Sequence, residues 1–545
     1  MAAPIQTEWF GPIPPAPRHS ITFHMPLWSN ILQFIEKDPE FFKQFKSMYP
    51  RIMPHKDVKE LIAKLLATTK SEGQSCIPFS SPESATECVK FATSPARQEN
   101  AVSPDQISIR IFDVPDVVRL YVVFLPAEKH KVAWPFWINA GVGVSSRLAE
   151  DCVKADGWKE VKVDEGVLEV VEVEAQSVLR GRIAGLIERA PVGPPRKAKV
   201  SPDDVYLFQT GMASIYSVHQ YILSVYNAKS VLFGWAFHST PHVLEDFGPG
   251  FKFLGNGTPE EIDELEEYLK EEAKEGRKIQ ALYLEFPSNP NLGTPDIGRI
   301  RKLADIHGFL LIIDDTIGSF CNVDVLGVAD IVLTSLTKSF SGYADVMAAS
   351  AVLNPSSTRY HELKGLFKKF YTNQFYNRDA EALEKNSRDY MARSVILNNN
   401  SLRLVEFLQG MAEDPNSSVA KVFYPTTLPS LPFYKERMRP ATADFTPGYG
   451  CLFTVELETI EATVAFYDNL NLHKGPHLGA PLTLVIPFVK GIYGKELERL
   501  GKYGMNERQI RVAPGLEDID VLIEEFGIAV KAADEVKKNT FVPLT

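Results

Sequence analysis

The sequence predicts an α/β protein whose central domain is built on a mostly parallel sheet. Between about residues 200 and 350, short apolar runs typical of strands alternate with helical patterns. The predicted strands are 205–208, 231–235, 281–284, 309–313 and 331–333. This alternation implies a sheet covered by helices on both faces, with its ligand at the carboxyl ends of the strands.

Two of the intervening helices carry start signals. In Thr258-Pro259-Glu260-Glu261, threonine is a predicted N-cap, proline occupies the first helical position and a glutamate completes a capping box. Thr294-Pro295 repeats the cap and the proline, and Gly308 is expected to end that second helix. Both signals support helical crossovers between parallel strands.

The length of 545 residues exceeds what a single core fills, so several domains are expected. Residues 1–140 form a predicted N-terminal extension, with a proline-punctuated arm, a helical stretch at 28–45 and strands at 107–112 and 117–124. Residues 141–395 form the large domain. Residues 396–545 form a smaller α/β domain, with helices at 402–411 and 518–533 and strands at 450–457 and 482–485.

Composition excludes several classes of partner. A net charge of −11 argues against nucleic acid and against a polybasic membrane contact. The five cysteines are scattered and form no C-x-x-C pair, so neither a disulfide framework nor a metal site is predicted. The start lacks a secretory pattern and no apolar run reaches the ~18 residues of a membrane helix. We expect a cytoplasmic protein.

A candidate anion site follows the first predicted strand, where Gly211 and Met212 open a helical pattern. Glycine allows close backbone approach, and the free N–H groups at a helix start suit a phosphate. A glycine that serves only the turn is the simpler alternative for this segment alone.

Asp314 ends another apolar run and is a candidate partner for a pyridine nitrogen. A carboxylate there keeps the nitrogen protonated, so that the ring can accept electrons from a carbanion. A helix cap or a surface turn is the alternative.

Lys338 lies 24 residues after Asp314, in Ser335-Leu336-Thr337-Lys338. A lysine that forms a Schiff base needs a partly desolvated position, where its pKa falls and the neutral amine becomes available. Ser335 and Thr337 would add hydroxyl donors to the phosphate at Gly211. Because these residues follow successive strands, they predict a pyridoxal 5′-phosphate site.

The same motifs resemble the cystathionine γ-synthase group of the pyridoxal-phosphate Cys/Met metabolism family, especially its fungal members. The matching runs are Thr210-Gly211-Met212-Ala213, Glu285-Phe286-Pro287-Ser288-Asn289-Pro290, Ile313-Asp314-Asp315-Thr316 and Ser341-Gly342-Tyr343-Ala344-Asp345-Val346 beyond Lys338. The resemblance implies a transferase of fold type I, with Asn289 beside the phenolic oxygen of the cofactor.

The resemblance also implies a substrate site near the C-terminus. The run from Ile510 to Asp518 is similar to the family segment whose arginine binds the α-carboxylate of the amino-acid substrate, which assigns that role to Arg511. Thr483 is expected to shape the same pocket.

Three positions depart from the family pattern. Phe237 stands where the family stacks a tyrosine on the cofactor ring, so stacking is kept and the hydroxyl is lost. His477 replaces a common serine and could act as an acid or base. The run Met347-Ala348-Ala349-Ser350 adds bulk where glycines are usual.

Family members complete the phosphate site with a Tyr-x-Arg from a neighbouring subunit, which implies a homodimer or homotetramer. Arg147, in Gly143-Val144-Ser145-Ser146-Arg147, is the match we assign, without the tyrosine. Tyr49-Pro50-Arg51 is its rival.

The resemblance implies γ-replacement on O-acetyl- or O-succinyl-L-homoserine, with Lys338 moving the protons and the cysteine thiol as nucleophile, giving cystathionine. The alternatives are a carbon nucleophile such as an enolisable keto acid, as in fungal secondary metabolism, and a γ-lyase. A catalytically silent paralogue is a further alternative, against which intact Lys338, Asp314 and Arg511 argue.

Overall fold

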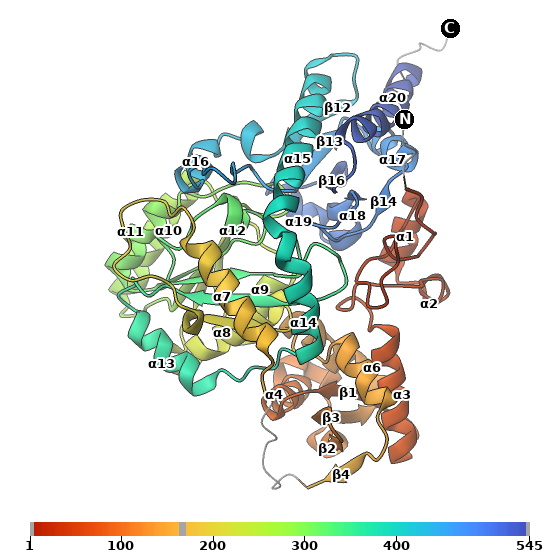
Figure 1. The fold of residues 1–545 in the computed structure, drawn as a ribbon, viewed down its shortest axis with the longest axis vertical. Helices are drawn as coiled ribbons and strands as arrows, with labels where there is room; N and C mark the ends of the chain where they lie inside the picture. The colour runs from red at the N-terminus through yellow and green to blue at the C-terminus, as the bar shows by residue number, and fades with distance from the viewer. Residues whose placement is uncertain (1–4, 163–170, 541–545) are drawn as a thin grey trace.

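The computed structural model describes residues 5–162 and 171–540. It consists of a central domain, a smaller C-terminal domain, an N-terminal sheet unit and an N-terminal arm (Figure 1). No helix in these described residues is long and apolar enough to cross a membrane. Short 3-10 helices occupy Pro95–Asn100, Pro104–Gln106, Ala127–Lys129, Pro202–Asp204, Ser387–Asp389 and Pro425–Thr427.

The central domain contains a seven-stranded sheet in the order β5-β11-β10-β9-β8-β6-β7. Strands β10, β9, β8, β6 and β7 pair in parallel, whereas β11 runs antiparallel to both of its neighbours, β10 and β5. The predicted mostly parallel sheet is therefore confirmed, although β7 and β11 were not predicted. The strands are β5 (Val205–Phe208), β6 (Ser230–Phe233), β7 (Phe251–Leu254), β8 (Ala281–Glu285), β9 (Leu310–Asp314), β10 (Ile331–Thr334) and β11 (Ala349–Leu353).

Helices bury this sheet on both faces. Successive strand residues point to opposite faces, and Leu282 and Leu311 enter one core cluster whereas Tyr283 and Ile312 enter the other. This explains the continuous apolar strands in the sequence. The helices are α7 (Glu174–Glu188), α8 (Gly211–Tyr226), α9 (Ser239–Asp246), α10 (Pro259–Lys274), α11 (Ile297–His307), α12 (Ser319–Asn322), α13 (Tyr360–Phe370) and α14 (Asn377–Asn386).

The helix starts match the sequence signals in one case and shift in the other. At α10 the Thr258 side chain accepts a hydrogen bond from the Glu261 N–H at 3.4 Å, as predicted. At α11 the cap is Asp296, which accepts from the Arg299 N–H at 2.9 Å. Thr294 instead donates to the Ser430 carbonyl at 3.1 Å, so the predicted cap joins the helix to the C-terminal region.

The C-terminal domain is a smaller, mostly antiparallel sheet in the order β12-β13-β16-β15-β14. Only β14 and β15 are parallel neighbours. The strands are β12 (Val419–Phe423), β13 (Phe453–Leu457), β14 (His473–Lys474), β15 (Leu484–Ile486) and β16 (Gln509–Ala513). The helices are α15 (Tyr390–Glu413), α16 (Leu431–Arg437), α17 (Ile460–Asn469), α18 (Phe488–Tyr493), α19 (Leu497–Gly501) and α20 (Ile519–Thr540).

The N-terminal sheet unit extends past residue 140, where the sequence analysis placed a boundary. Its four strands are antiparallel, in the order β1-β3-β2-β4. The elements are α3 (Lys56–Thr69), β1 (Gln74–Phe79), α4 (Pro82–Thr93), β2 (Ser108–Val114), β3 (Val118–Pro126), α5 (His130–Ala140), α6 (Ser146–Lys154) and β4 (Lys159–Val161).

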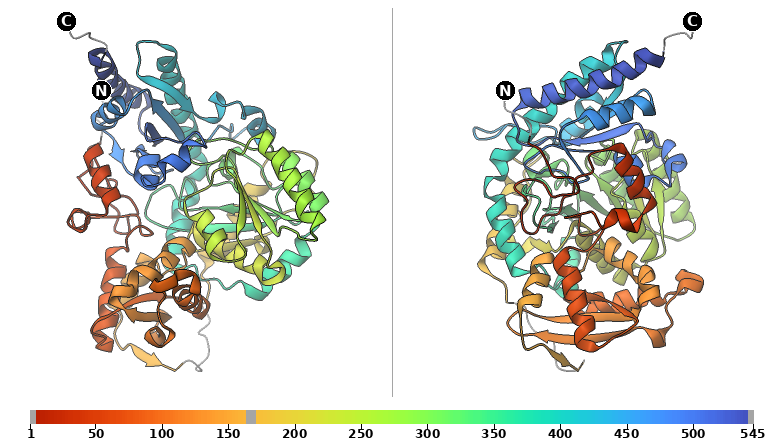
Figure 2. Two further views of the ribbon diagram at one scale, coloured as in Figure 1. Left: turned by 180° about the vertical axis from the view of Figure 1, so that it is seen from behind. Right: turned by 90° about the vertical axis from the view of Figure 1, so that its right-hand side faces the viewer.

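The N-terminal arm, residues 5–53, packs on the C-terminal domain and contains α1 (Trp28–Glu36) and α2 (Pro39–Phe42) (Figure 2). Phe23, Met25 and Ile31 join the core of that domain. The Tyr467 hydroxyl donates to the Met25 carbonyl at 2.8 Å. These contacts fix the arm on the C-terminal domain, and after α2 the Arg51 side chain reaches the central domain, where it donates to the Ser239 hydroxyl at 2.9 Å.

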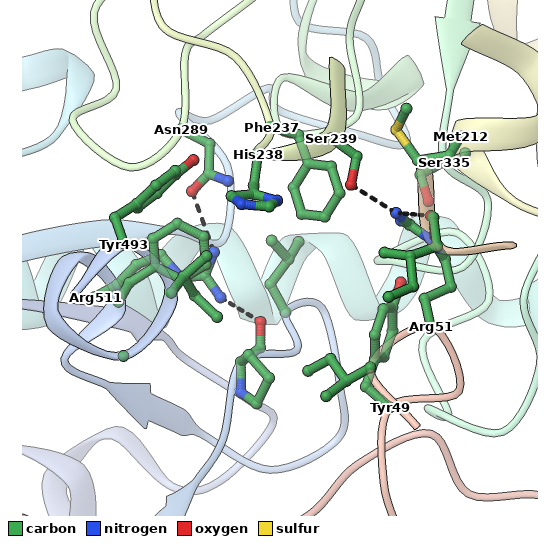
Figure 3. A pocket seen from close by; sticks show the side chains of 18 of the residues that line it. Tyr49, Arg51, Met212, Phe237, His238, Ser239, Asn289, Ser335, Tyr493 and Arg511 are labelled. Carbon is green, nitrogen blue, oxygen red and sulfur yellow. Dashed lines mark hydrogen bonds between the residues drawn. The ribbon is translucent and has the colours of Figure 1, made fainter. Parts of the chain in front are cut away.

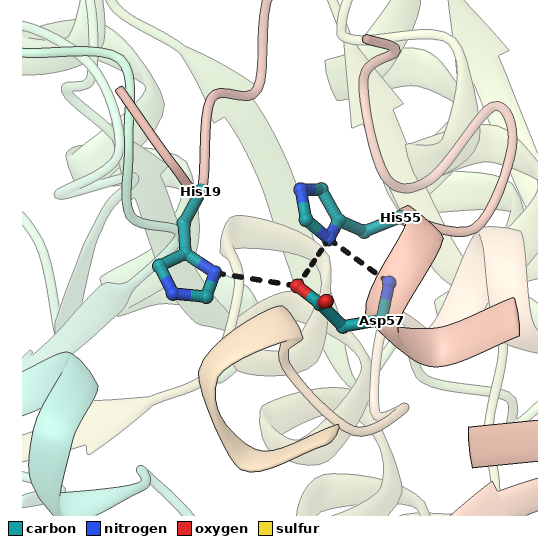
Figure 4. Close-up of side chains that lie close together, drawn as sticks. All are labelled: His19, His55 and Asp57. Atoms are coloured by element: carbon teal, nitrogen blue, oxygen red, sulfur yellow. Dashed lines mark hydrogen bonds and ion pairs between the residues drawn. The ribbon is translucent and has the colours of Figure 1, made fainter. Parts of the chain in front are cut away.

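A buried polar joint ties the arm to α3 (Figure 4). Asp57 accepts two hydrogen bonds from Arg18, at 2.5 and 2.7 Å, and lies 2.9 Å from His55 and 3.8 Å from His19. The two imidazoles and the carboxylate are close enough to share a metal ion. Because the Arg18 guanidinium already binds both carboxylate oxygens, we interpret the cluster as an ion-paired joint.

Candidate active site

A cavity of about 690 Å³ opens where the central domain, the C-terminal domain and the arm meet. Its polar wall includes the carboxyl ends of the central strands, as the sheet topology requires. Eight of the residues predicted from sequence line this cavity: Gly211, Met212, Phe237, Asn289, Asp314, Ser335, Lys338 and Arg511.

Lys338 lines the cavity. Burial lowers the pKa of its amine, and the positive charges of Arg511 and Arg51 act in the same direction. Its Nζ lies 5.1 Å from the centre of the Tyr49 ring. For Tyr49, burial alone raises the hydroxyl pKa, but the positive charges of Lys338 and Arg51 make the net shift downward. The site thus favours a neutral amine on Lys338.

His477 also contacts the lysine. Its Nδ1 lies 3.4 Å from Lys338 Nζ, and the ring is 1% exposed. Burial first, and then the positive charges of Lys338 and Arg511, hold its pKa well below the usual range. Nε2 has no hydrogen-bond partner among the residues that the structure describes. His477 is therefore a neutral neighbour of the lysine.

Two carboxyl groups share the ends of adjacent strands. Asp314 on β9 is in register with Glu285 on β8. Burial raises the pKa of both, and for Glu285 the negative charge of Asp314 adds to the effect. Glu285 accepts from the Phe237 N–H at 2.6 Å, and Asp314 accepts from the Thr316 N–H at 2.9 Å. This pair favours holding a proton at the sheet edge.

One end of the cavity presents donors for an anion. Gly211 begins α8, and a Cβ there would lie 3.1 Å from the Ser335 Cβ, so glycine lets the helix start close to the lysine loop. Arg51 lies beside them. Its guanidinium donates to the Ile138 carbonyl at 2.6 and 2.9 Å and to the Ser239 hydroxyl at 2.9 Å. Helix N–H groups, a hydroxyl and a buried guanidinium are typical phosphate ligands.

The opposite end presents Arg511. Its Nη1 donates to Asn289 at 3.1 Å, and its Nη2 donates to the Pro476 carbonyl. The guanidinium carbon lies 3.9 Å from the centre of the Phe488 ring. Burial lowers the pKa of Arg511 to about 9, which leaves it charged at neutral pH. The Phe237 ring lies between the two arginines (Figure 3).

This arrangement fits pyridoxal phosphate. The donors at Gly211 and Ser335 suit its phosphate, Asp314 can hold the proton of its pyridine nitrogen, and Phe237 offers a face for its ring. Lys338 presents a poorly solvated amine to the same space. The residues present therefore match the chemistry of the cofactor at each position.

Three predicted residues do not line the cavity. Arg147 is held by Asp345 and Asp379, with ion-pair distances of 3.2 and 3.1 Å. Thr337 exchanges two hydrogen bonds with the backbone of Ala348, at 2.9 and 3.1 Å. The guanidinium group of Arg147 and the hydroxyl group of Thr337 therefore bind other groups within the protein. Local sequence could not reveal these partners.

Thr483 is the third of these residues. Its hydroxyl donates to Glu517 at 3.0 Å and accepts from the Gly515 N–H at 3.0 Å. It supports the loop after Arg511 and does not reach the cavity.

The cavity also contains residues that the sequence analysis did not assign. Arg51 and Tyr49 were weighed only as a rival motif. His238, next to Phe237, has its pKa lowered to about 4 by burial. Tyr493 accepts a hydrogen bond from the Trp235 indole at 3.3 Å. No spacing pattern connects these residues, because the arm and α18 reach the site only through tertiary packing.

The fold and the site together define an enzyme that depends on pyridoxal phosphate. Residues 200–531 match the family described as Cys/Met metabolism PLP-dependent enzyme, and residues 57–145 match the fungal trans-sulfuration enzyme N-terminal domain. The chain belongs to this Cys/Met metabolism family and is a PLP-dependent enzyme of the transferase/lyase class, similar to cystathionine γ-synthase.

Full-length relatives support this placement. The cystathionine gamma-synthase-like enzyme iboG2 of Amanita muscaria is 34% identical, over 96% of both chains. The cystathionine gamma-synthase of Neurospora crassa is 30% identical, over 97% of this chain and 99% of its own. The solved cystathionine gamma synthase of Xanthomonas oryzae pv. oryzae superposes with a TM-score of 0.54 at 22% identity, over 67% of this chain and 87% of that one. The last comparison supports the fold alone.

Proposed function

We propose that the enzyme catalyses γ-replacement on an O-activated L-homoserine, such as the O-acetyl or O-succinyl ester. The observation that carries this proposal is the shared cavity, in which Lys338, with a lowered pKa, lines the same space as a phosphate end and a carboxylate end. When bound, pyridoxal phosphate supplies an aldehyde for the substrate amine and a ring that accepts electrons.

Residues of the chain have separate roles in the other steps of the reaction. Arg511 binds the α-carboxylate of the substrate, which orients its Cα toward Lys338. The neutral amine of Lys338 takes the Cα proton and then a Cβ proton, so that the bond from Cγ to the ester oxygen can break. It returns protons to Cβ and Cα after the nucleophile has bonded to Cγ. Asp314 would keep the pyridine nitrogen of the bound cofactor protonated. Arg51 holds the phosphate in place of Arg147.

These roles do not determine the nucleophile, because these residues act on the homoserine ester and the cofactor and not on the second substrate. The name of the Neurospora relative supports cysteine, which would give cystathionine. A carbon nucleophile is the second candidate, and the apolar arm residues that line the cavity favour it. Assembly as a homodimer or homotetramer and a cytoplasmic location are also part of the proposal.

A product assay tests the proposal. Purified enzyme loaded with cofactor is given either homoserine ester, and release of the acyl group and the amino-acid product are followed by mass. Lys338→Ala is expected to abolish turnover, whereas Lys495→Ala, an exposed lysine at the same cavity, should retain it. Ester turnover by Lys338→Ala at the rate of the unaltered enzyme would refute the assignment.

A further inference from the structure

Part of the cavity wall comes from the N-terminal arm and is apolar. We call this part the arm wall; its residues are Phe34, Ile35, Phe42, Ile52 and Met53. All five are only partly buried, although they pack against the core of the C-terminal domain. Apolar surface that faces a cavity continuous with a catalytic site indicates contact with an apolar ligand.

Tertiary contacts hold the arm wall in place. Helix α1 packs on α18 where Gly494 would bring a Cβ to 3.2 Å from Ile35, so glycine permits the close approach. The Trp28 N–H donates to Asp468 at 2.6 Å, which anchors the start of α1. The wall is therefore an ordered surface of the cavity that Lys338 also lines.

The charges in the cavity do not suit a second amino acid. Its buried guanidinium groups are Arg51 and Arg511, and the proposed function uses both. Apart from the two carboxyl groups at the strand ends and the residues used in the proposed function, the charged groups that line the cavity are the exposed Lys37 and Lys495 and the half-buried Glu496. Cysteine would bring a second carboxylate and ammonium group. Groups that keep their contact with water compensate little for the desolvation of a carboxylate and an ammonium group against the arm wall, so the wall suits a hydrocarbon better than cysteine.

We propose that the arm wall binds the hydrocarbon part of the nucleophile, so that the second substrate is an apolar carbon acid or thiol and not cysteine. This inference rests on the proposed γ-replacement. In the reaction, the bond from Cγ to the ester oxygen breaks and a bond from Cγ to the carbon or sulfur of the nucleophile forms. The proton that the nucleophile loses accompanies the departing acyl group as a carboxylic acid, and nothing is oxidised or reduced.

A chain-length series tests the arm wall. Holoenzyme with O-acetyl- or O-succinyl-L-homoserine is offered cysteine, the thiols ethanethiol, butanethiol and hexanethiol, or β-keto esters with alkyl chains of matching length. Products are quantified by mass. We expect kcat/KM for the reactive series to rise about fourfold for each added methylene that the wall covers, and to exceed the value for cysteine.

Two variants on α1 locate the effect. Ile35→Asn replaces a wall residue, whereas Leu32→Asn replaces a side chain on the same helix that is 42% exposed. Ile35→Asn should flatten the chain-length dependence and leave KM for the homoserine ester unchanged, and Leu32→Asn should change neither. Melting temperatures show whether both variants fold. If Ile35→Asn does not fold, Ile35→Ala replaces it in the assay and is expected to weaken the chain-length dependence partly.

The outcomes separate the two proposals. A flat series with cysteine as the best nucleophile would overturn the apolar assignment and leave γ-replacement intact. Equal loss of chain-length dependence in Leu32→Asn would overturn the role of the wall. A rise confined to the thiols or to the keto esters supports the wall and identifies the reacting atom. Failure to release acetate or succinate with every nucleophile would instead refute the proposed γ-replacement.

Discussion

Replacing Arg51 or Arg147 by alanine tests which of the two is the proposed phosphate ligand and which is a structural residue. Arg51 lines the cavity, and a charge-assisted hydrogen bond is worth about 1.5–3 kcal/mol. Arg51→Ala should therefore weaken cofactor affinity about 10- to 150-fold. The Arg147 side chain is 10% exposed and its partner Asp379 is 4% exposed. Breaking such buried pairs costs about 3–5 kcal/mol of stability.

Cofactor titration followed by visible absorbance measures the first effect, and thermal melting of the cofactor-free protein measures the second. We expect Arg51→Ala to bind weakly and melt normally, and Arg147→Ala to melt early. Arg51→Lys, which keeps the charge but not the forked geometry, should fall between alanine and the unaltered protein. The reasoning fails if Arg147→Ala melts normally and loses cofactor affinity while Arg51→Ala binds normally.

Three further predictions concern the lysine, the arm and pH. His477→Ser should lower kcat about fivefold by removing the contact to Lys338 without changing cofactor affinity; an unchanged kcat would show that the contact has no role. Because Arg51 and Lys338 of one chain line one cavity, mixing Arg51→Ala with Lys338→Ala subunits should not restore activity, and restored activity would place Arg51 in a neighbouring subunit's site. Burial lowers the pKa of His24 and of His473 from 6.5 to about 3. The unfolded chain therefore binds about two more protons below pH 6.5, and stability should fall by about 2.7 kcal/mol per pH unit on acidification; thermal melts that do not change between neutral pH and pH 4 would contradict this.

Local patterns predicted the sheet and the core of the cofactor site. Gly211, Asp314 and Lys338 each follow an apolar run, and carboxyl ends of parallel strands meet at one edge of a sheet. Strand β11 was missed because Ala349-Ser350-Ala351 lacks the β-branched and aromatic residues that mark a strand. The antiparallel strand was therefore visible only through its pairing with β5 and β10.

The remaining assignments depended on which partner each side chain meets in space. The resemblance of the motifs assigned the phosphate to Arg147 and kept Arg51 as a rival. In the structure Asp345 and Asp379 bind Arg147, while packing of the arm brings Arg51 to the cavity. Thr483 was placed at the substrate by motif, yet its hydroxyl meets Glu517. Periodicity and strand ends are properties of the chain itself, so the fold class and a candidate cofactor site at Lys338 could be predicted from them, and the resemblance of the motifs added the family. Contacts between segments hundreds of residues apart are properties of the packed fold. Only these contacts bring Arg51 to the cavity and form its apolar arm wall.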